Sequence, residues 1–91
     1  MASQNLVKLE RPLKALANRR RLAIVAYIKK HREAFVGEIA DAVRLSLKAT
    51  SKHLAVLYAA DILEREQRSI HMLYRISKEM PEVARTLIAI L

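Results

Sequence analysis

The chain has 91 residues, a length that fits one domain, and so short a chain would gain from a core shared with a second copy. Apolar residues make up 53% of it, which excludes a disordered chain, and the single Gly and two Pro favour helices. The absence of cysteine excludes disulfides, thiolate metal sites and a catalytic thiol. No apolar stretch approaches the roughly 20 residues of a membrane span, so we expect a cytoplasmic protein that does not contact a membrane.

The net charge of +8 is distributed unevenly along the chain. Residues 1–32 contain nine Lys or Arg and one acid, whereas residues 33–91 contain eight of each sign. The whole excess therefore lies in the first third. Such asymmetry indicates a polyanionic partner such as nucleic acid, with a solvated basic surface as the alternative.

Leucines recur at steps of three and four in the first segment, which predicts a helix over residues 3–17. Pro12 lies inside this pattern and either kinks the helix or restarts it. Asn18 is a good N-cap for a second helix that ends near His31. Its first turn consists of three arginines at 19–21, and a phosphate bound there would face both these cations and free backbone N–H groups. The alternative places Arg21 against the core, paired with a carboxylate.

Two short helices follow, separated by about three residues. The first covers 36–43, residues 44–46 form the connection, and the hydroxyl of Ser46 caps a helix that runs to about Ala60. This arrangement over residues 36–60 is typical of a helix-turn-helix, in which the second helix enters the major groove of DNA.

The second of these helices has a clear inward and outward face. With Leu54 at the centre of the buried face, Leu47, Thr50 and Tyr58 lie beside it. No acid occurs between residues 46 and 60. Small and basic side chains let a helix backbone approach base edges and phosphates closely. The outward face consists of Lys48, Ala49, Lys52, Ala55 and Val56, with Ser51 and His53 at its flanks.

Residues 62–77 predict a two-stranded β-hairpin, the wing, because β-branched and aromatic residues return after a polar tip at 67–69. The tip contains neither Gly nor Asn, which favours a turn longer than two residues. Pro81 opens a last helix within residues 79–91, and its apolar side chains cover more of its surface than one small domain can bury. The expected fold is a winged helix-turn-helix, mainly α with a small β-hairpin wing and about five helices, in the order α-α-α-α-β-β-α.

Two segments carry a family resemblance. LKALANRRRLAIVAYI resembles the opening of the arsenic-repressor (ArsR/SmtB) family of transcription regulators, and VGEIADAVRLSLKATSKHLAVLYAADILEREQRSIHMLYRIS is similar to its helix-turn-helix and wing. The similarity runs from Leu13 to Ser77, and its most specific part is the pattern S-x-x-x-x-S-x-H-L-x-x-L, which begins at Ser46. The resemblance implies a homodimer joined by the first and last helices. It also implies DNA contacts at Lys48, Ala49, Ser51, Lys52 and His53.

The sequence departs from the family at its metal sites. Phe35 and Gly37 stand where metal-sensing members have cysteines, and the last helix offers Glu79 and Glu82 but no histidine. The three histidines at 31, 53 and 71 are too scattered to suggest a replacement. We therefore expect neither a metal nor another cofactor, and the sequence leaves any small-molecule effector unknown.

We expect a homodimeric repressor that reads a palindromic operator in double-stranded DNA. No catalytic motif is present, so an enzyme is not expected. A winged helix that binds RNA or another protein is the alternative, but RNA recognition uses exposed aromatic residues, and the tyrosines here are predicted to be buried. The predicted DNA-binding residues are Arg19, Arg20, Lys48, Ala49, Thr50, Ser51, Lys52, His53, Gln67, Arg68 and Ser69.

A dimer interface is predicted from surplus apolar surface at the two ends of the chain. The first and last helices, within 3–17 and 79–91, would supply it. Its predicted residues are Leu6, Leu9, Leu13, Val83, Leu87, Ile88, Ile90 and Leu91.

Overall fold

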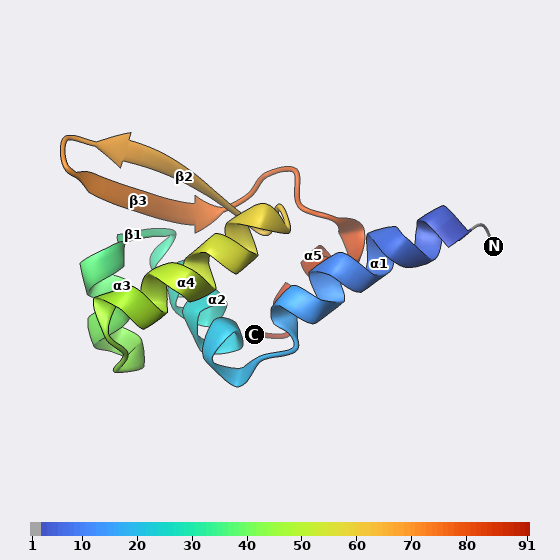
Figure 1. Ribbon diagram of the computed structural model, residues 1–91, viewed down its shortest axis with the longest axis horizontal. Helices are drawn as coiled ribbons and strands as arrows, with labels where there is room; N and C mark the ends of the chain where they lie inside the picture. Colours follow the sequence, from blue (N-terminus) through green and yellow to red (C-terminus); the bar gives the residue numbers. More distant parts are fainter. Residues whose placement is uncertain (1–2) are drawn as a thin grey trace.

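The computed structural model describes residues 3–91, with side chains from residue 5 onward. Five helices and three strands follow one another along the chain (Figure 1). No helix in the described part is both long and apolar enough to cross a membrane. The elements are α1 (Ser3–Leu16), α2 (Arg19–His31), β1 (Glu33–Phe35), α3 (Val36–Val43), α4 (Leu47–Ala59), β2 (Leu63–Arg68), β3 (His71–Ile76) and α5 (Glu82–Ile88).

The core forms where α2, α3 and α4 meet the base of the sheet. Ile24 and Ile28 of α2, Ile39 of α3, and Leu54 and Leu57 of α4 are all fully buried. Each such side chain contributes about 1.5–3 kcal/mol relative to its exposed state. The core therefore holds α4 against α2 and α3.

The sheet has the strand order β1-β3-β2, with both pairs antiparallel. The strand β1 was not predicted, because three residues are too few for an alternating pattern, and it depends on pairing with β3 through Ala34 and Tyr74. The hairpin pairs Arg68 with His71, which leaves a turn of only two residues. The prediction of a longer turn is therefore wrong. Ser69 takes the positive φ of 58° that a type II′ turn needs at its first position.

The helix α1 continues through Pro12 without restarting. Pro12 is fully buried, and Leu16 packs beside it in the core, so tertiary packing offsets the loss of the hydrogen bond that proline cannot donate. Towards its N-terminus the same helix projects from the body of the protein, and Leu6 and Leu9 remain exposed.

The helix α5 is shorter than predicted, since it ends at Ile88 rather than at residue 91. The ammonium group of Lys29 donates to the carbonyl oxygens of Ile88 and Leu91 at 2.9 Å each, and to that of Ala89 at 3.3 Å. A lysine on α2 thus adds hydrogen bonds to carbonyl groups at the C-terminal end of α5, where the helix itself supplies few donors.

Candidate nucleic-acid interface

The helix-turn-helix is built by two local devices. Arg44 takes a left-handed conformation directly after α3, and the N–H of Leu45 returns to the carbonyl of Ala40 at 3.1 Å. Ser46 then caps α4, because its hydroxyl oxygen accepts a hydrogen bond from the N–H of Ala49 at 3.0 Å. Together they set the start of α4, and the cap predicted at Ser46 is confirmed.

The outward face of α4 has the character that its sequence predicts. Lys48, Ser51 and Lys52 are exposed, whereas Ala49 and His53 are partly buried. Leu47 is also exposed, although its spacing from Leu54 predicted burial, because it lies in the first turn beyond the edge of the core. The first two turns of α4 therefore present two ammonium groups and a hydroxyl to solvent.

Thr50 requires a correction. It was predicted to contact DNA, but its side chain is fully buried and faces the core beside Leu54 and Leu57. The four-residue spacing from Thr50 to Leu54 places both on the inward face of the helix. Thr50 therefore belongs to the structural support of the recognition helix and not to its reading surface.

Arg21 connects α2 to both α1 and α4. Its Nε donates to the carbonyl oxygen of Ala15 at 2.6 Å, and another guanidinium nitrogen donates to the carbonyl oxygen of Lys14 at 3.2 Å. The third guanidinium nitrogen lies 3.3 Å from Nδ1 of His53. The carboxylate partner considered from the sequence is replaced by helix-end carbonyls and an imidazole. The run of three arginines at 19–21 marked Arg21 as a candidate functional residue. Its contacts with both α1 and α4 were not predicted.

The environment of His53 favours its neutral form. Partial burial lowers the pKa of His53 below its ordinary value of 6.5, and the positive charges of Arg21 and Arg20 lower it further. Neutral imidazole is also the form that can accept a hydrogen bond at Nδ1. His53 is therefore fixed in position by Arg21 and is less accessible than the two lysines of α4.

The start of α2 lies next to the recognition helix. Asn18 caps α2 by accepting hydrogen bonds from the N–H groups of Arg20 and Arg21 at 2.9 and 3.1 Å, which confirms the predicted cap. Arg19 and Arg20 are exposed. The distance of 3.3 Å between the guanidinium of Arg21 and Nδ1 of His53 shows that the two segments are close in space. The structure thus brings the basic start of α2 together with the middle of α4.

The wing carries a chain of ion pairs. The guanidinium of Arg75 on the central strand binds Glu33 of β1 at 3.3 Å and Glu66 of β2 at 2.9 Å. Arg68 binds the other oxygen of Glu66 at 3.0 Å. Contacts with Arg68 and Arg75 lower the pKa of Glu66 to about 2. Gln67 and Arg68 lie in β2 rather than at the tip, where Ser69 and the highly exposed Ile70 are found.

The predicted dimer residues differ in how far they are exposed. Leu6, Leu9 and Leu13 are exposed on α1, and Ile90 and Leu91 are exposed beyond the end of α5. Val83 and Leu87 are half-buried. Ile88 requires a correction, because it is buried in the core of its own subunit and cannot serve as an interface residue.

Two further expectations concern the aromatic residues and metals. Tyr74 is buried, but Tyr58 is 39% exposed, so the prediction that the tyrosines are buried is wrong for this residue. The guanidinium of Arg65 covers the Tyr58 ring at 3.9 Å from its centroid. Among the described side chains, no group of three or more His, Asp or Glu residues could hold a metal ion.

A capped recognition helix after a tight turn, together with an antiparallel hairpin, defines a winged helix-turn-helix protein. A family described as a helix-turn-helix domain matches residues 16–66. The chain belongs to the ArsR/SmtB family of winged helix-turn-helix transcriptional regulators. Family and fold class are therefore as the sequence predicts, and they are those of regulators rather than of enzymes.

Solved structures of regulators resemble the whole described fold. Reduced HlyU from Vibrio cholerae is 30% identical, with 98% of this chain and 90% of that chain covered and a TM-score of 0.82. Mb0332 from Mycobacterium bovis, described as a homodimeric winged helix-turn-helix DNA-binding domain and a possible ArsR-family regulator, is 31% identical. The match covers 97% of this chain and 78% of that chain, with a TM-score of 0.82. A search of curated proteins found no match.

Proposed function

We propose that this protein is a homodimeric repressor that reads a palindromic operator in double-stranded DNA. The observation that carries the proposal is the position of the basic N-terminal half of α4. It lies at the same end of the molecule as the tip of the wing (Figure 1). One duplex can therefore meet a helix of major-groove size and a hairpin at once.

Within this proposal the side chains have distinct roles. Lys48 and Lys52 contact bases or phosphates, and Ser51 adds a hydroxyl donor beside them. Arg19 and Arg20 bind phosphate at the start of α2, where backbone dipoles also favour an anion. Ala49 permits close approach of the helix to the groove. The wing residues Gln67, Arg68 and Ser69 contact the flanking backbone or minor groove, and His53 positions the helix through Arg21.

The dimer is supported by the exposed leucines of α1 and by the homodimeric state of Mb0332. A symmetric pair of subunits binds half-sites whose centres are about 10 bp apart, and repression follows when the bound protein covers a promoter. The surface of α1 around Leu9 and Leu13 has a shallow, mainly apolar hollow, which a side chain of a second subunit could fill.

Selection of duplexes from a random pool by the purified protein tests operator reading, and an enriched palindrome is the expected result. Enrichment without inverted symmetry would contradict the dimeric mode. The affinity for an RNA duplex and for an RNA hairpin is then measured. If either equals the affinity for the enriched DNA, the result would favour the RNA alternative.

The same duplex then tests one residue. Lys52→Ala should weaken binding by about 1–3 kcal/mol if the lysine reads a base, or reduce the salt slope by about one if it meets phosphate. Lys30→Ala is the matched control, because Lys30 is an exposed cation at the far end of α2. Equal effects of the two variants would contradict a specific role for Lys52.

A further inference from the structure

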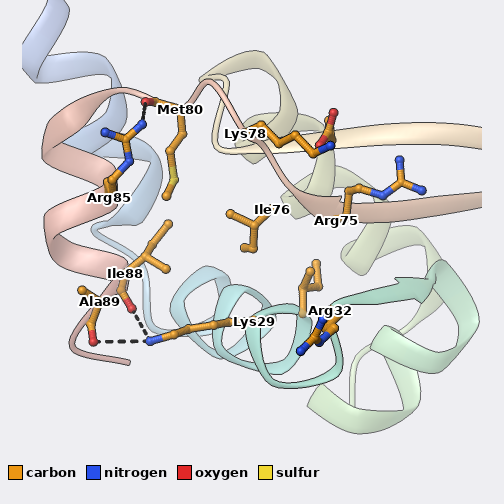
Figure 2. Close-up of a pocket in the computed structure, with 11 residues that line it drawn as sticks. Lys29, Arg32, Arg75, Ile76, Lys78, Met80, Arg85, Ile88 and Ala89 are labelled. Atoms are coloured by element: carbon orange, nitrogen blue, oxygen red, sulfur yellow. Dashed lines mark hydrogen bonds between the residues drawn. The ribbon is translucent and has the colours of Figure 1, made fainter.

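An open cavity of about 480 Å³ lies at the base of the hairpin, between α2, the β2–β3 sheet and α5 (Figure 2). Its size falls within the range of small-molecule sites. Apolar side chains from three elements line it, and Figure 2 shows Ile76 and Ile88 near its middle. The other apolar contributions come from Ile28, Met80 and Ala89.

Cationic side chains surround this apolar centre. The cavity is lined by one acid, Glu64, and by five basic residues: Lys29, Arg32, Arg75, Lys78 and Arg85. Excess positive charge around an apolar floor attracts an anion with an apolar body and repels an organic cation. An inorganic anion alone would leave the apolar centre unfilled.

Two of the five cations are available for a ligand. Lys29 is bound to carbonyl groups at the end of α5, and Arg75 is bound to carboxylates of the wing. Arg85 donates weakly to the carbonyl of Met80 at 3.4 Å. Within residues 5–91, Arg32 and Lys78 make no side-chain hydrogen bond or ion pair, and both are exposed at the edge of the cavity.

We propose that this cavity binds a small carboxylic acid with an apolar chain. Its carboxylate pairs with Lys78 at the edge of the cavity, and its chain covers Ile76 and Ile88. The site is separate from the DNA-reading surface, since it lies at the base of the wing and contains no residue of α4.

Titration calorimetry on the free protein, without DNA, tests the site independently of the proposed DNA function. The probes are decanoate and decyltrimethylammonium, which share an apolar chain and differ in charge. We expect decanoate to bind at one site and the cation not to bind. Binding of the cation with similar affinity, or no binding of decanoate, would overturn the proposal.

Two variants locate the binding. Lys78→Glu should weaken decanoate binding about tenfold, whereas Lys30→Glu, which makes the same charge change outside the cavity, should leave it unchanged. Circular dichroism checks that each variant is folded. Equal loss of binding in both lysine variants would show a general charge effect and contradict the site.

Discussion

The hydroxyl of Thr50 is buried in the core and has no hydrogen-bond partner among the described residues. Thr50→Val keeps the branched shape and removes the polar atom, so it should raise the free energy of unfolding by about 1 kcal/mol. Urea denaturation measures this change. Ser51→Ala, at an exposed neighbour on the same helix, should leave stability nearly unchanged. A loss of stability in Thr50→Val would show that the hydroxyl does have a partner in solution.

His53 makes stability depend on pH in a defined direction. Its pKa is lowered in the folded state, so between that value and 6.5 the unfolded chain binds the proton more strongly. The stabilising contribution is complete above pH 6.5 and is lost as the pH falls through the folded-state pKa. The free energy of unfolding should fall between pH 7.5 and pH 5.5, and the fall should be smaller in His53→Gln than in the unmodified protein. The glutamine amide keeps an acceptor but does not titrate. An equal loss in both proteins would contradict this role of His53.

The wing holds two of its arginines, Arg68 and Arg75, in ion pairs with its own carboxylates or that of β1. Glu66 binds both Arg68 and Arg75. Glu66→Gln removes a negative charge from the wing and releases Arg68 for a phosphate, so it should raise DNA affinity several-fold at low salt. A filter-binding series over salt concentration measures the gain, which should shrink as the salt concentration rises.

Glu79→Gln is the control for this prediction, because it makes the same charge change at an exposed residue in the loop before α5. If both variants gain equally, net charge and not the release of Arg68 explains the effect. Weaker binding by Glu66→Gln would instead show that the ion pairs hold the wing in its binding shape.

Elements with strong local signals could be predicted from the sequence. Asn18 and Ser46 cap their helices by side-chain hydrogen bonds that depend only on the next three residues. Features that depend on distant partners were missed. The strand β1 forms only because β3 lies beside it, and α5 ends early, where Lys29 of α2 reaches its carbonyl groups. The two-residue turn needs a positive φ at Ser69, and a serine in the sequence does not predict that conformation.

The candidate interface was predictable in its composition but not in its internal contacts. Helical periodicity placed Lys48 and Lys52 outward, and both are exposed. The same periodicity placed Thr50 inward. The prediction that Thr50 contacts DNA therefore conflicted with the helical spacing. The partners of Arg21 are distant in sequence or are backbone oxygens. No residue pattern specifies such contacts.

The elongated shape of the molecule separates the proposed dimer interface from the proposed DNA-binding surface. The chain extends over 43 × 25 × 22 Å, with the wing tip and the N-terminal part of α1 at opposite ends of the longest axis (Figure 1). A dimer formed through α1 would leave both recognition helices and both wings uncovered. Successive major grooves on one side of a duplex are about 34 Å apart, a spacing that two such subunits could span.

Leu6→Glu tests the proposed dimer. Leu6 is 57% exposed in the single subunit, so a carboxylate there should not disturb the fold but should be costly in an apolar interface. Sedimentation velocity should show a monomer. Leu87 is less suitable, because it packs against the core and its replacement would also destabilise the subunit.

Ile70→Glu is the control for Leu6→Glu, since Ile70 is an equally apolar, exposed residue at the wing tip. It should sediment like the unmodified protein. A Leu6→Glu protein that remains dimeric would exclude this part of α1 from the interface.

The contacts of Arg21 limit how the specificity of this protein could be redesigned. Replacing α4 with a recognition helix that has no histidine at position 53 would leave one guanidinium nitrogen without its acceptor. The other two nitrogens would still bind the end of α1, so the new helix would lack a contact that helps fix its orientation. A lysine at position 21 could not replace the planar fork of donors. A transplanted helix should therefore carry a histidine at position 53, or residue 21 should be exchanged together with it.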